Sequence, residues 1–162
     1  MTQALRFIAP PAVLEPEMDN TDQKTRSRIM TAIRSRGNRS TELRLRGALV
    51  ASGIRGWRMH ARDLIGRPDF VFDKHRLVVF VDGCYWHGCP ECGRPPHSNL
   101  EYWTPKLDGN RRRDKAATSE LKAAQWGVLR VWEHELEVPA NVVKKITELL
   151  GRRAHSRQRR ST

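Results

Sequence analysis

The chain has 162 residues, of which 38% are hydrophobic and 30% are charged, and this fits one globular domain rather than two. No apolar run approaches the roughly 20 residues needed to cross a bilayer, so membrane insertion is disfavoured. The 30 lysines and arginines exceed the 18 aspartates and glutamates, and the formal charge of +12 indicates a polyanionic partner, most simply nucleic acid.

Both ends of the chain lack the periodicity of a folded element. Residues 1–20 are interrupted by prolines and end in a polar run, so we expect a flexible leader, with Met18 as an alternative start. Residues 151–162 hold five arginines among small polar residues, and such a composition buries too little apolar surface to become ordered. The sequence therefore predicts a folded domain over residues 21–150, followed by a disordered arginine-rich tail.

Two helices are expected in the first third of the chain. Hydrophobic residues recur at helical spacing over residues 24–36, which predicts the first helix. The second should begin at Ser40 or Thr41 and end at Gly53. Glu42 would then stand in the first turn of the second helix, where a carboxylate favours the helix dipole.

Strands are expected after the turn at residues 66–68, whose proline forces extended chain. Two apolar segments follow this turn, over residues 69–72 and 76–82, and they predict a hairpin. The remaining expected elements are a helix, a strand and a closing helix, over residues 110–125, 128–132 and 141–150. This order of elements is typical of a mixed α/β domain.

Two carboxylates flank the predicted hairpin. Asp69 begins its first strand and Asp82 ends its second, so a turn centred between His75 and Arg76 would make them direct cross-strand partners. Such partners lie roughly 5 Å apart at Cβ, close enough to share a divalent cation. This outline is found in many metal-dependent nucleases, and His87 would supply a base for an attacking water. Each residue also has an ordinary interpretation, as a turn cap, a strand end and a surface or metal-bound imidazole.

Three cysteines, Cys84, Cys89 and Cys92, lie within nine positions. An odd number at this spacing favours a metal site in a reducing compartment over disulfides, so we expect a cytoplasmic protein. Three thiolates and one imidazole would make a closed, structural zinc site, although cysteines without a metal are the alternative. The residues leave the fourth ligand open among three histidines, His87, His97 and His134.

Aromatic pairs form another pattern. Tyr85-Trp86 and Tyr102-Trp103 lie in polar, loop-like surroundings near basic residues, where aromatic rings can wedge between base steps of a duplex. Trp126 lies in a periodic apolar context typical of a core residue, as does Trp132.

Several of these motifs occur together in one order: Lys24–Ile33, Gly66–Asp69, Phe80–Pro90, Tyr102-Trp103 with Lys106, Asn110 and Arg113-Asp114, and Gly127–Glu133. In this order and at this spacing they resemble the very short patch repair (Vsr) endonucleases, over residues 22–138. The resemblance implies a restriction-endonuclease-like α/β fold, with a central mixed sheet flanked by helices and a structural zinc site. It also implies a Mg²⁺-dependent nick 5′ of the thymine in a T:G mismatch that arises when 5-methylcytosine deaminates.

The resemblance also implies roles for individual residues. Asp69 matches a metal-binding aspartate, Val81 a residue whose carbonyl contacts the Mg²⁺, Glu42 an acid of the metal's water shell, and His87 the base. Asp82 stands where some members have histidine, which leaves three alternatives for it: a metal ligand, a hydrogen-bond partner near the phosphate, or neither. The implied zinc ligands are Cys84, Cys89, Cys92 and His134. The implied DNA-binding residues are Met30, Tyr85, Trp86, Trp103, Lys106 and Asn110.

The expected partner is double-stranded DNA with a T:G mismatch, with a functional link to a DNA cytosine methyltransferase and to mismatch-repair proteins. Two other functions remain open on the residues alone. One is a restriction or homing nuclease that cuts both strands of matched DNA. The other is a zinc-containing DNA-binding module without catalysis, which the net charge and the cysteines alone would favour.

Overall fold

A mixed four-stranded sheet organises the chain, with its strands in the order β1-β2-β3-β4. The computed structural model describes residues 39–93 and 99–158, which all belong to one compact unit. β2 pairs antiparallel with both β1 and β3, whereas β4 runs parallel to β3. The strands are β1 (Arg58–Met59), β2 (Phe70–Phe72), β3 (Leu77–Asp82) and β4 (Gly127–Trp132). This mixed sheet confirms the predicted α/β class.

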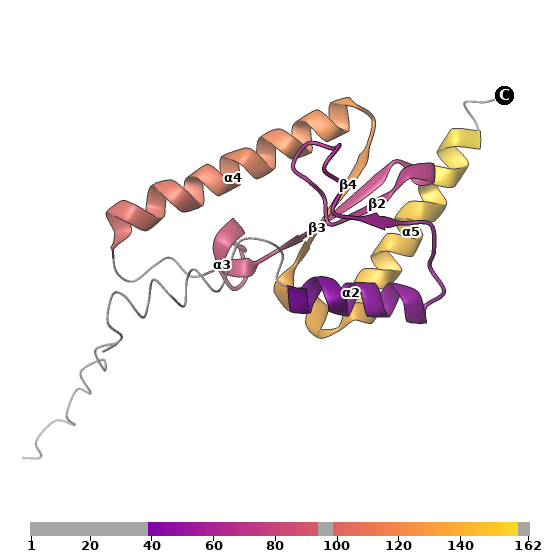
Figure 1. Ribbon diagram of the computed structural model, residues 1–162, viewed down its shortest axis with the longest axis horizontal. Helices are drawn as coiled ribbons and strands as arrows, with labels where there is room; N and C mark the ends of the chain where they lie inside the picture. Colours follow the sequence, from indigo (N-terminus) through magenta and orange to yellow (C-terminus); the bar gives the residue numbers. More distant parts are fainter. Residues whose placement is uncertain (1–38, 94–98, 159–162) are drawn as a thin grey trace, which may run out of the picture. The chain divides into compact units, whose positions relative to one another are not determined.

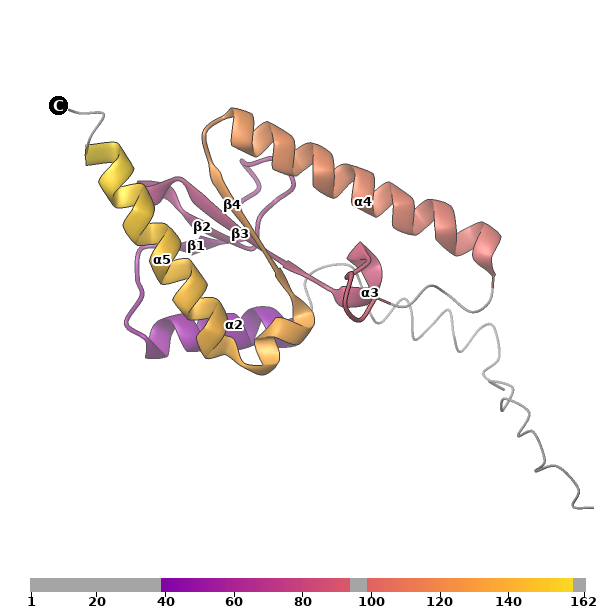
Figure 2. The same cartoon turned by 180° about the vertical axis from the view of Figure 1, so that it is seen from behind.

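Helices cover both faces of the sheet (Figures 1 and 2). Leu45 of α2 and Ile146 of α5 belong to the core on one face. On the other face, Leu121 of α4 packs with Val78 and Phe80 of β3. Because both faces of β3 are covered, this strand is apolar at nearly every position instead of alternating with polar residues. The three long helices are α2 (Arg39–Ala51), α4 (Leu100–Ala123) and α5 (Pro139–Gln158).

The hairpin between β2 and β3 forms as predicted, but its register is different. Phe70 pairs with Val79 and Phe72 with Leu77, so the hairpin is centred one residue earlier than expected. Its turn is the short 3₁₀ helix η1 (Asp73–His75). The predicted direct pairing of Asp69 with Asp82 is therefore wrong, because the turn type sets the register of a hairpin.

The ends of two helices also differ from the predictions. α4 begins at Leu100, ten residues before the expected helix over 110–125, and contains Pro105, a residue that usually disfavours helix interiors. α5 continues to Gln158, so the predicted disorder is wrong for residues 151–158. Arg153 shows why this end is ordered, since its side chain donates to the carbonyl oxygens of His75 and Gln125, each at 2.6 Å.

Some predictions fall outside the described residues. These are the flexible leader, the helix over 24–36 with Met30, the candidate zinc ligand His97 and the last four residues of the tail. Among the described residues, no helix combines the length and the apolar character needed to cross a membrane.

Candidate active site

Asp69 is held at the start of β2 by backbone groups of β3. Its own N–H donates to the carbonyl oxygen of Val79 at 3.1 Å, and its Oδ2 accepts a hydrogen bond from the N–H of Val81 at 2.7 Å. The side chain therefore lies across β3 in a fixed position, beside the residue whose carbonyl was predicted to contact a metal.

Glu42 and His60 lie next to this carboxylate. Their ligand atoms and that of Asp69 are all within 4.8 Å of one another, and His60 Nε2 is 3.6 Å from a carboxylate oxygen of Glu42. Glu42 is only 4% exposed and lies within this cluster. Its carboxylate can therefore take part in the site as well as interact with the helix dipole. Sequence reasoning missed His60, because its approach depends on β1–β2 pairing, in which the His60 N–H donates to the carbonyl oxygen of Asp69 at 3.1 Å.

The electrostatics of this cluster favour a cation. Burial, together with the negative charges of Glu42 and Asp82, raises the pKa of Asp69 to about 6, although the hydrogen bond from Val81 opposes the shift. The carboxylates of Asp69 and Glu42 repel each other when both are ionised. A hard divalent cation relieves this repulsion and takes oxygen ligands, so the residues present fit such an ion.

His87 lies at the end of α3 (Cys84–His87), the short helix that directly follows β3. Its Nδ1 is 2.6 Å from Oδ2 of Asp114 on α4 and 3.7 Å from Oδ1 of Asp82. An ionised carboxylate only accepts hydrogen bonds, so Nδ1 carries a proton and Nε2 is left as the basic nitrogen. Asp114 was recognised as part of a motif but not predicted as a site residue.

Burial lowers the pKa of His87, but the hydrogen bond to Asp114 and the charges of Asp82 and Asp114 outweigh burial, so the net shift is upward. The charge of Asp82 thus raises the pKa of both His87 and Asp69.

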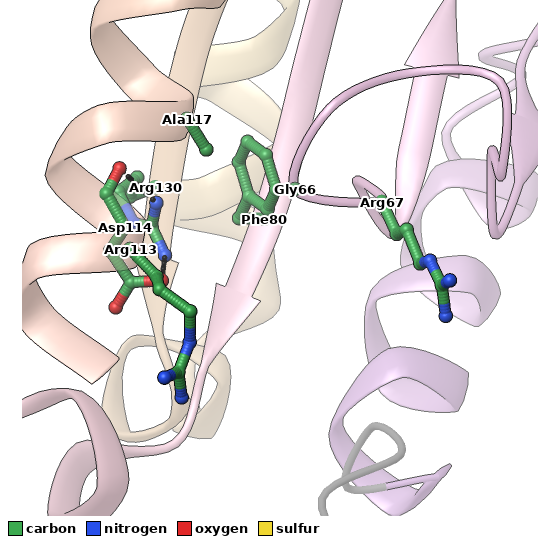
Figure 3. A pocket seen from close by; sticks show the side chains of 7 residues that line it. All are labelled: Gly66, Arg67, Phe80, Arg113, Asp114, Ala117 and Arg130. Carbon is green, nitrogen blue, oxygen red and sulfur yellow. Dashed lines mark hydrogen bonds and ion pairs between the residues drawn. The ribbon is translucent and has the colours of Figure 1, made fainter. Parts of the chain in front are cut away.

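Asp82 is 2% exposed and forms a two-pronged ion pair with Arg130 of β4, at 2.6 and 2.7 Å. Arg130 also contacts Asp114, with Nη2 at 2.9 Å from Oδ1. Figure 3 shows Arg130 and Asp114 together where α4 meets the sheet. Sequence reasoning missed Arg130 because it lies 48 residues after Asp82, and only the parallel pairing of β3 with β4 brings the two together.

The three cysteines converge on His134, which lies in the 3₁₀ helix η2 (Glu133–Glu137) after β4. Nδ1 of His134 is 3.2 Å from the sulfur of Cys84, 3.6 Å from that of Cys89 and 3.3 Å from that of Cys92. The four ligand atoms lie within 4.8 Å of one another, which fits a tetrahedral zinc ion.

A carboxylate contacts His134 on the side of its ring away from the cysteines. Nε2 of His134 faces a carboxylate oxygen of Glu91 at 3.2 Å, the kind of contact that orients metal-binding histidines. Sequence reasoning missed Glu91. His87 contacts Asp114 rather than this cluster, and His134 is the histidine that lies with the three cysteines among the described residues.

Four aromatic rings gather between α3 and α4. Trp103 lies 6.4 Å from Tyr85, 5.8 Å from Trp86 and 4.9 Å from Tyr102, measured between ring centroids. Lys106 Nζ is 5.4 Å from the ring centroids of both Tyr102 and Trp103. The prediction that these aromatic residues lie on loops is wrong, because Tyr85 and Trp86 belong to α3 and the other two to α4.

Asn110 joins the same surface, since its side-chain amide donates to the carbonyl oxygen of Trp86 at 3.0 Å. The predicted DNA-binding residues of the described chain therefore lie on α3 and α4.

Comparison with known proteins gives a consistent result. The family model described as DNA mismatch endonuclease Vsr matches residues 18–94. Type II nicking enzyme V.XorIIP of Xanthomonas oryzae is 42% identical over 120 residues, which cover 73% of this chain and 86% of that protein. Type II nicking enzyme V.NaeI of Lentzea aerocolonigenes is 44% identical over 118 residues, 68% of each chain. DNA mismatch endonuclease Vsr of Escherichia coli is 39% identical over 117 residues, covering 71% of this chain and 73% of its own length.

The mixed sheet flanked by helices and the clustered acidic and histidine groups around β3 define a restriction-endonuclease-like nuclease. The chain belongs to the Vsr family of DNA mismatch endonucleases. It is thus a DNA-cleaving hydrolase of a family that acts at mismatches, which excludes the alternative of a binding module without catalysis.

Proposed function

We propose that this protein nicks double-stranded DNA on the 5′ side of the thymine in T:G mismatches that arise from deaminated 5-methylcytosine, and so begins very short patch repair. The family supports action at mismatches, and the names of the relatives support the nicking of one strand. The observation that carries the proposal is the arrangement around one strand end, with Asp69, Glu42 and His60 clustered there and His87 held by Asp114.

In the proposed mechanism, Asp69 and the carbonyl of Val81 would hold Mg²⁺, and Glu42 and His60 would contact its water shell. When bound, the ion supplies positive charge that stabilises the scissile phosphate in the transition state. Nε2 of His87 takes a proton from the attacking water, while Asp114 orients the ring and balances the charge of the imidazolium.

The aromatic cluster would recognise the mismatch. Tyr85, Trp86 and Trp103 are large rings that can enter between base steps, and a mispair costs less to unstack than a matched pair. Lys106 and Asn110 share this surface and would contact the mispaired bases. Selectivity for T:G would then come from both unstacking cost and base contacts.

The cluster of Cys84, Cys89, Cys92 and His134 would hold Zn²⁺ in a structural role. It ties the start of α3 to η2, and α3 carries both His87 and two of the wedge aromatics. Zinc would therefore stiffen the catalytic base and the recognition surface at once. A cytosine methyltransferase would set the sequence in which these mismatches arise, and mismatch-repair proteins are the expected functional partners.

A nicking assay tests this function. Duplexes of identical flanking sequence carrying T:G, other mismatches or matched C:G are incubated with and without Mg²⁺. We expect one nicked strand, strong preference for T:G and no reaction without divalent cation. Cleavage of both strands of matched DNA would instead indicate the restriction-type nuclease, and the relatives' description as nicking enzymes weighs against that result.

A further inference from the structure

Arg130 connects the buried carboxylate of Asp82 with the half-buried carboxylate of Asp114, which lie on different elements. Its Nε and Nη2 donate to Asp82 at 2.6 and 2.7 Å, and Nη2 also lies 2.9 Å from Oδ1 of Asp114. The guanidinium stacks on the ring of Phe80, with 4.7 Å between its central carbon and the ring centroid, and Nη1 is 3.3 Å from Oγ1 of Thr118. The guanidinium is bound by carboxylates along its edge and covered by an aromatic ring on its face, so it has little rotational freedom. It therefore fixes the positions of the carboxylates that it binds.

Asp114 divides its two oxygens between Arg130 and His87. Oδ1 faces the guanidinium at 2.9 Å and Oδ2 faces Nδ1 of His87 at 2.6 Å. Asp82 is 3.7 Å from the same nitrogen, beyond hydrogen-bond distance, so it does not orient the ring. The carboxylate that orients His87 is therefore itself oriented by Arg130.

We infer that Arg130 is a positioning residue, which holds Asp114 so that His87 keeps its proton on Nδ1 and presents Nε2 as the base. We assign Asp82 the role of anchoring Arg130, not that of a ligand to the catalytic cation. The inference rests on the proposed function for the role of His87. Both oxygens of Asp82 face the guanidinium, so the charge of Asp82 is already balanced without a metal.

The space around Arg130 makes this role testable. Arg130 and Asp114 line a pocket of about 440 Å³ together with Phe80, Ala117 and residues of the turn before β2 (Figure 3). A shortened or uncharged side chain at position 130 would leave Asp114 free to turn into this pocket. The unbalanced carboxylates of Asp82 and Asp114 would also repel each other, which gives Asp114 a reason to move.

The first experiment compares Arg130→Met and Arg130→Lys on a T:G duplex. Methionine keeps the apolar contact with Phe80 but loses the charge, and we expect kcat to fall about 100-fold while KM changes less than about threefold. Lysine restores one charge without the fork, so it should recover part of the lost kcat. An Arg130→Met protein with wild-type kcat, or one whose loss lies entirely in KM, would overturn the inference.

Arg58 provides a matched control. It also links two aspartates, Asp63 and Asp73, but at the edge of the sheet. Arg58→Met should leave kcat within about threefold of wild type, because a surface ion pair contributes little. An equal loss in both variants would mean that Arg130 acts only through general stability.

Asp82→Asn tests the assignment of Asp82. We expect a lower kcat with an unchanged Mg²⁺ concentration for half-maximal nicking, because the asparagine weakens the anchor and not the metal site. A shift of that concentration by about tenfold or more would make Asp82 a metal ligand and overturn the assignment.

Nitrogen NMR of the neutral His87 ring separates the inference from the proposed function. Wild type should show the proton on Nδ1. Arg130→Met should lose this preference and Arg130→Lys should lose part of it, while both keep the His134 signal. If the wild type does not nick T:G duplexes, the proposed function fails and this readout alone judges Arg130. If Arg130→Met does not fold, Arg130→Lys is judged by the same kinetic and spectroscopic measurements. An unchanged tautomer in a folded Arg130 variant overturns the inference in either case.

Discussion

The carboxylate of Asp69 is a half-buried negative charge beside a second acid, Glu42, and it costs folding free energy whenever no cation is bound. Its position is nevertheless held by a hydrogen bond from Val81 that an amide oxygen can also accept. The carboxylate of Asp69 therefore lowers the stability of the metal-free protein, although the proposed metal site needs it.

Asp69→Asn should stabilise the protein at pH 7 without added divalent cation, by about 1–2 kcal/mol. Burial raises the pKa of Asp69 from 3.8 to about 6, so the protonated form is favoured in the folded state. The cost of the wild-type carboxylate is absent below pH 3.8, grows between pH 3.8 and about 6, and is complete above about 6. Thermal denaturation at pH 7 and pH 4.5 measures this difference, which should shrink at the lower pH. A less stable asparagine variant at pH 7 would contradict the expectation.

Asp69→Ala and His87→Ala should each lose nicking by at least about 100-fold, because one removes a proposed metal ligand and the other the proposed base. Both proteins should fold and keep their zinc, since neither side chain belongs to the cysteine cluster. His155→Ala is a matched control, because His155 is an exposed histidine on α5 that contacts only a carbonyl of its own helix in the described structure. Full activity in either test variant would refute the assigned role.

At the scale of elements, the stability of the short helix α3 comes from contacts with its neighbours and not from the helix itself. It has four residues, none of them buried, and neither hydrophobic core cluster includes any of its side chains. A helix this short is not stable by itself. The cysteine cluster at its start and the contacts with α4 therefore define its position.

Removal of zinc should disorder α3 and abolish nicking while most of the helical circular dichroism remains, because the cores on the two faces of the sheet do not use the metal. Metal analysis of the purified protein should find about one zinc ion per chain. Re-addition of zinc should restore both nicking and the fluorescence of Trp86. Unchanged activity in the zinc-free protein would show that the cluster does not support the site.

The tryptophans of α4 and of the segment after it should separate recognition from stability. Trp103 lies in the aromatic cluster, so Trp103→Ala should reduce the preference for T:G over C:G by about tenfold with little change in melting temperature. Trp126 packs against the core under α4, so Trp126→Ala should cost about 2–4 kcal/mol of stability and keep the preference. Nicking assays and thermal denaturation of both variants measure this. A loss of stability in Trp103→Ala together with a loss of T:G preference in Trp126→Ala would contradict both assignments.

At the scale of the whole molecule, the excess of positive charge governs encounter with DNA. The formal charge is +12, and binding to a duplex releases condensed cations from the phosphates. We expect the logarithm of the affinity to fall linearly with the logarithm of salt concentration for T:G and C:G duplexes alike. Titrations from about 50 to 200 mM salt measure the two slopes. Equal slopes, with a constant difference in log affinity between the T:G and C:G duplexes, would support mismatch recognition by contacts that do not depend on charge. An affinity that does not change with salt would refute electrostatic binding.

The sequence by itself determined those features that depend on local order. The strands β2, β3 and β4, the extent of α2, and the chemistry of the cysteine cluster all follow from short-range patterns of apolar, turn and ligand residues. The resemblance to the family added two hypotheses: that His134 is the fourth zinc ligand, and that Asp69 and His87 act at the same phosphodiester. Motifs and their spacing can be compared between sequences even when the three-dimensional arrangement is unknown.

The tertiary structure decided which distant side chains meet. Arg130 reaches Asp82 only because α4 carries the chain across to a parallel β4, and His60 reaches Asp69 only through an edge strand of two residues. The hairpin register depended on the 3₁₀ turn at Asp73–His75, and the order of residues 151–158 accompanies carbonyl contacts of Arg153 with distant loops. Such contacts join residues far apart in the chain, and their energies depend on geometry and burial that a linear pattern does not contain.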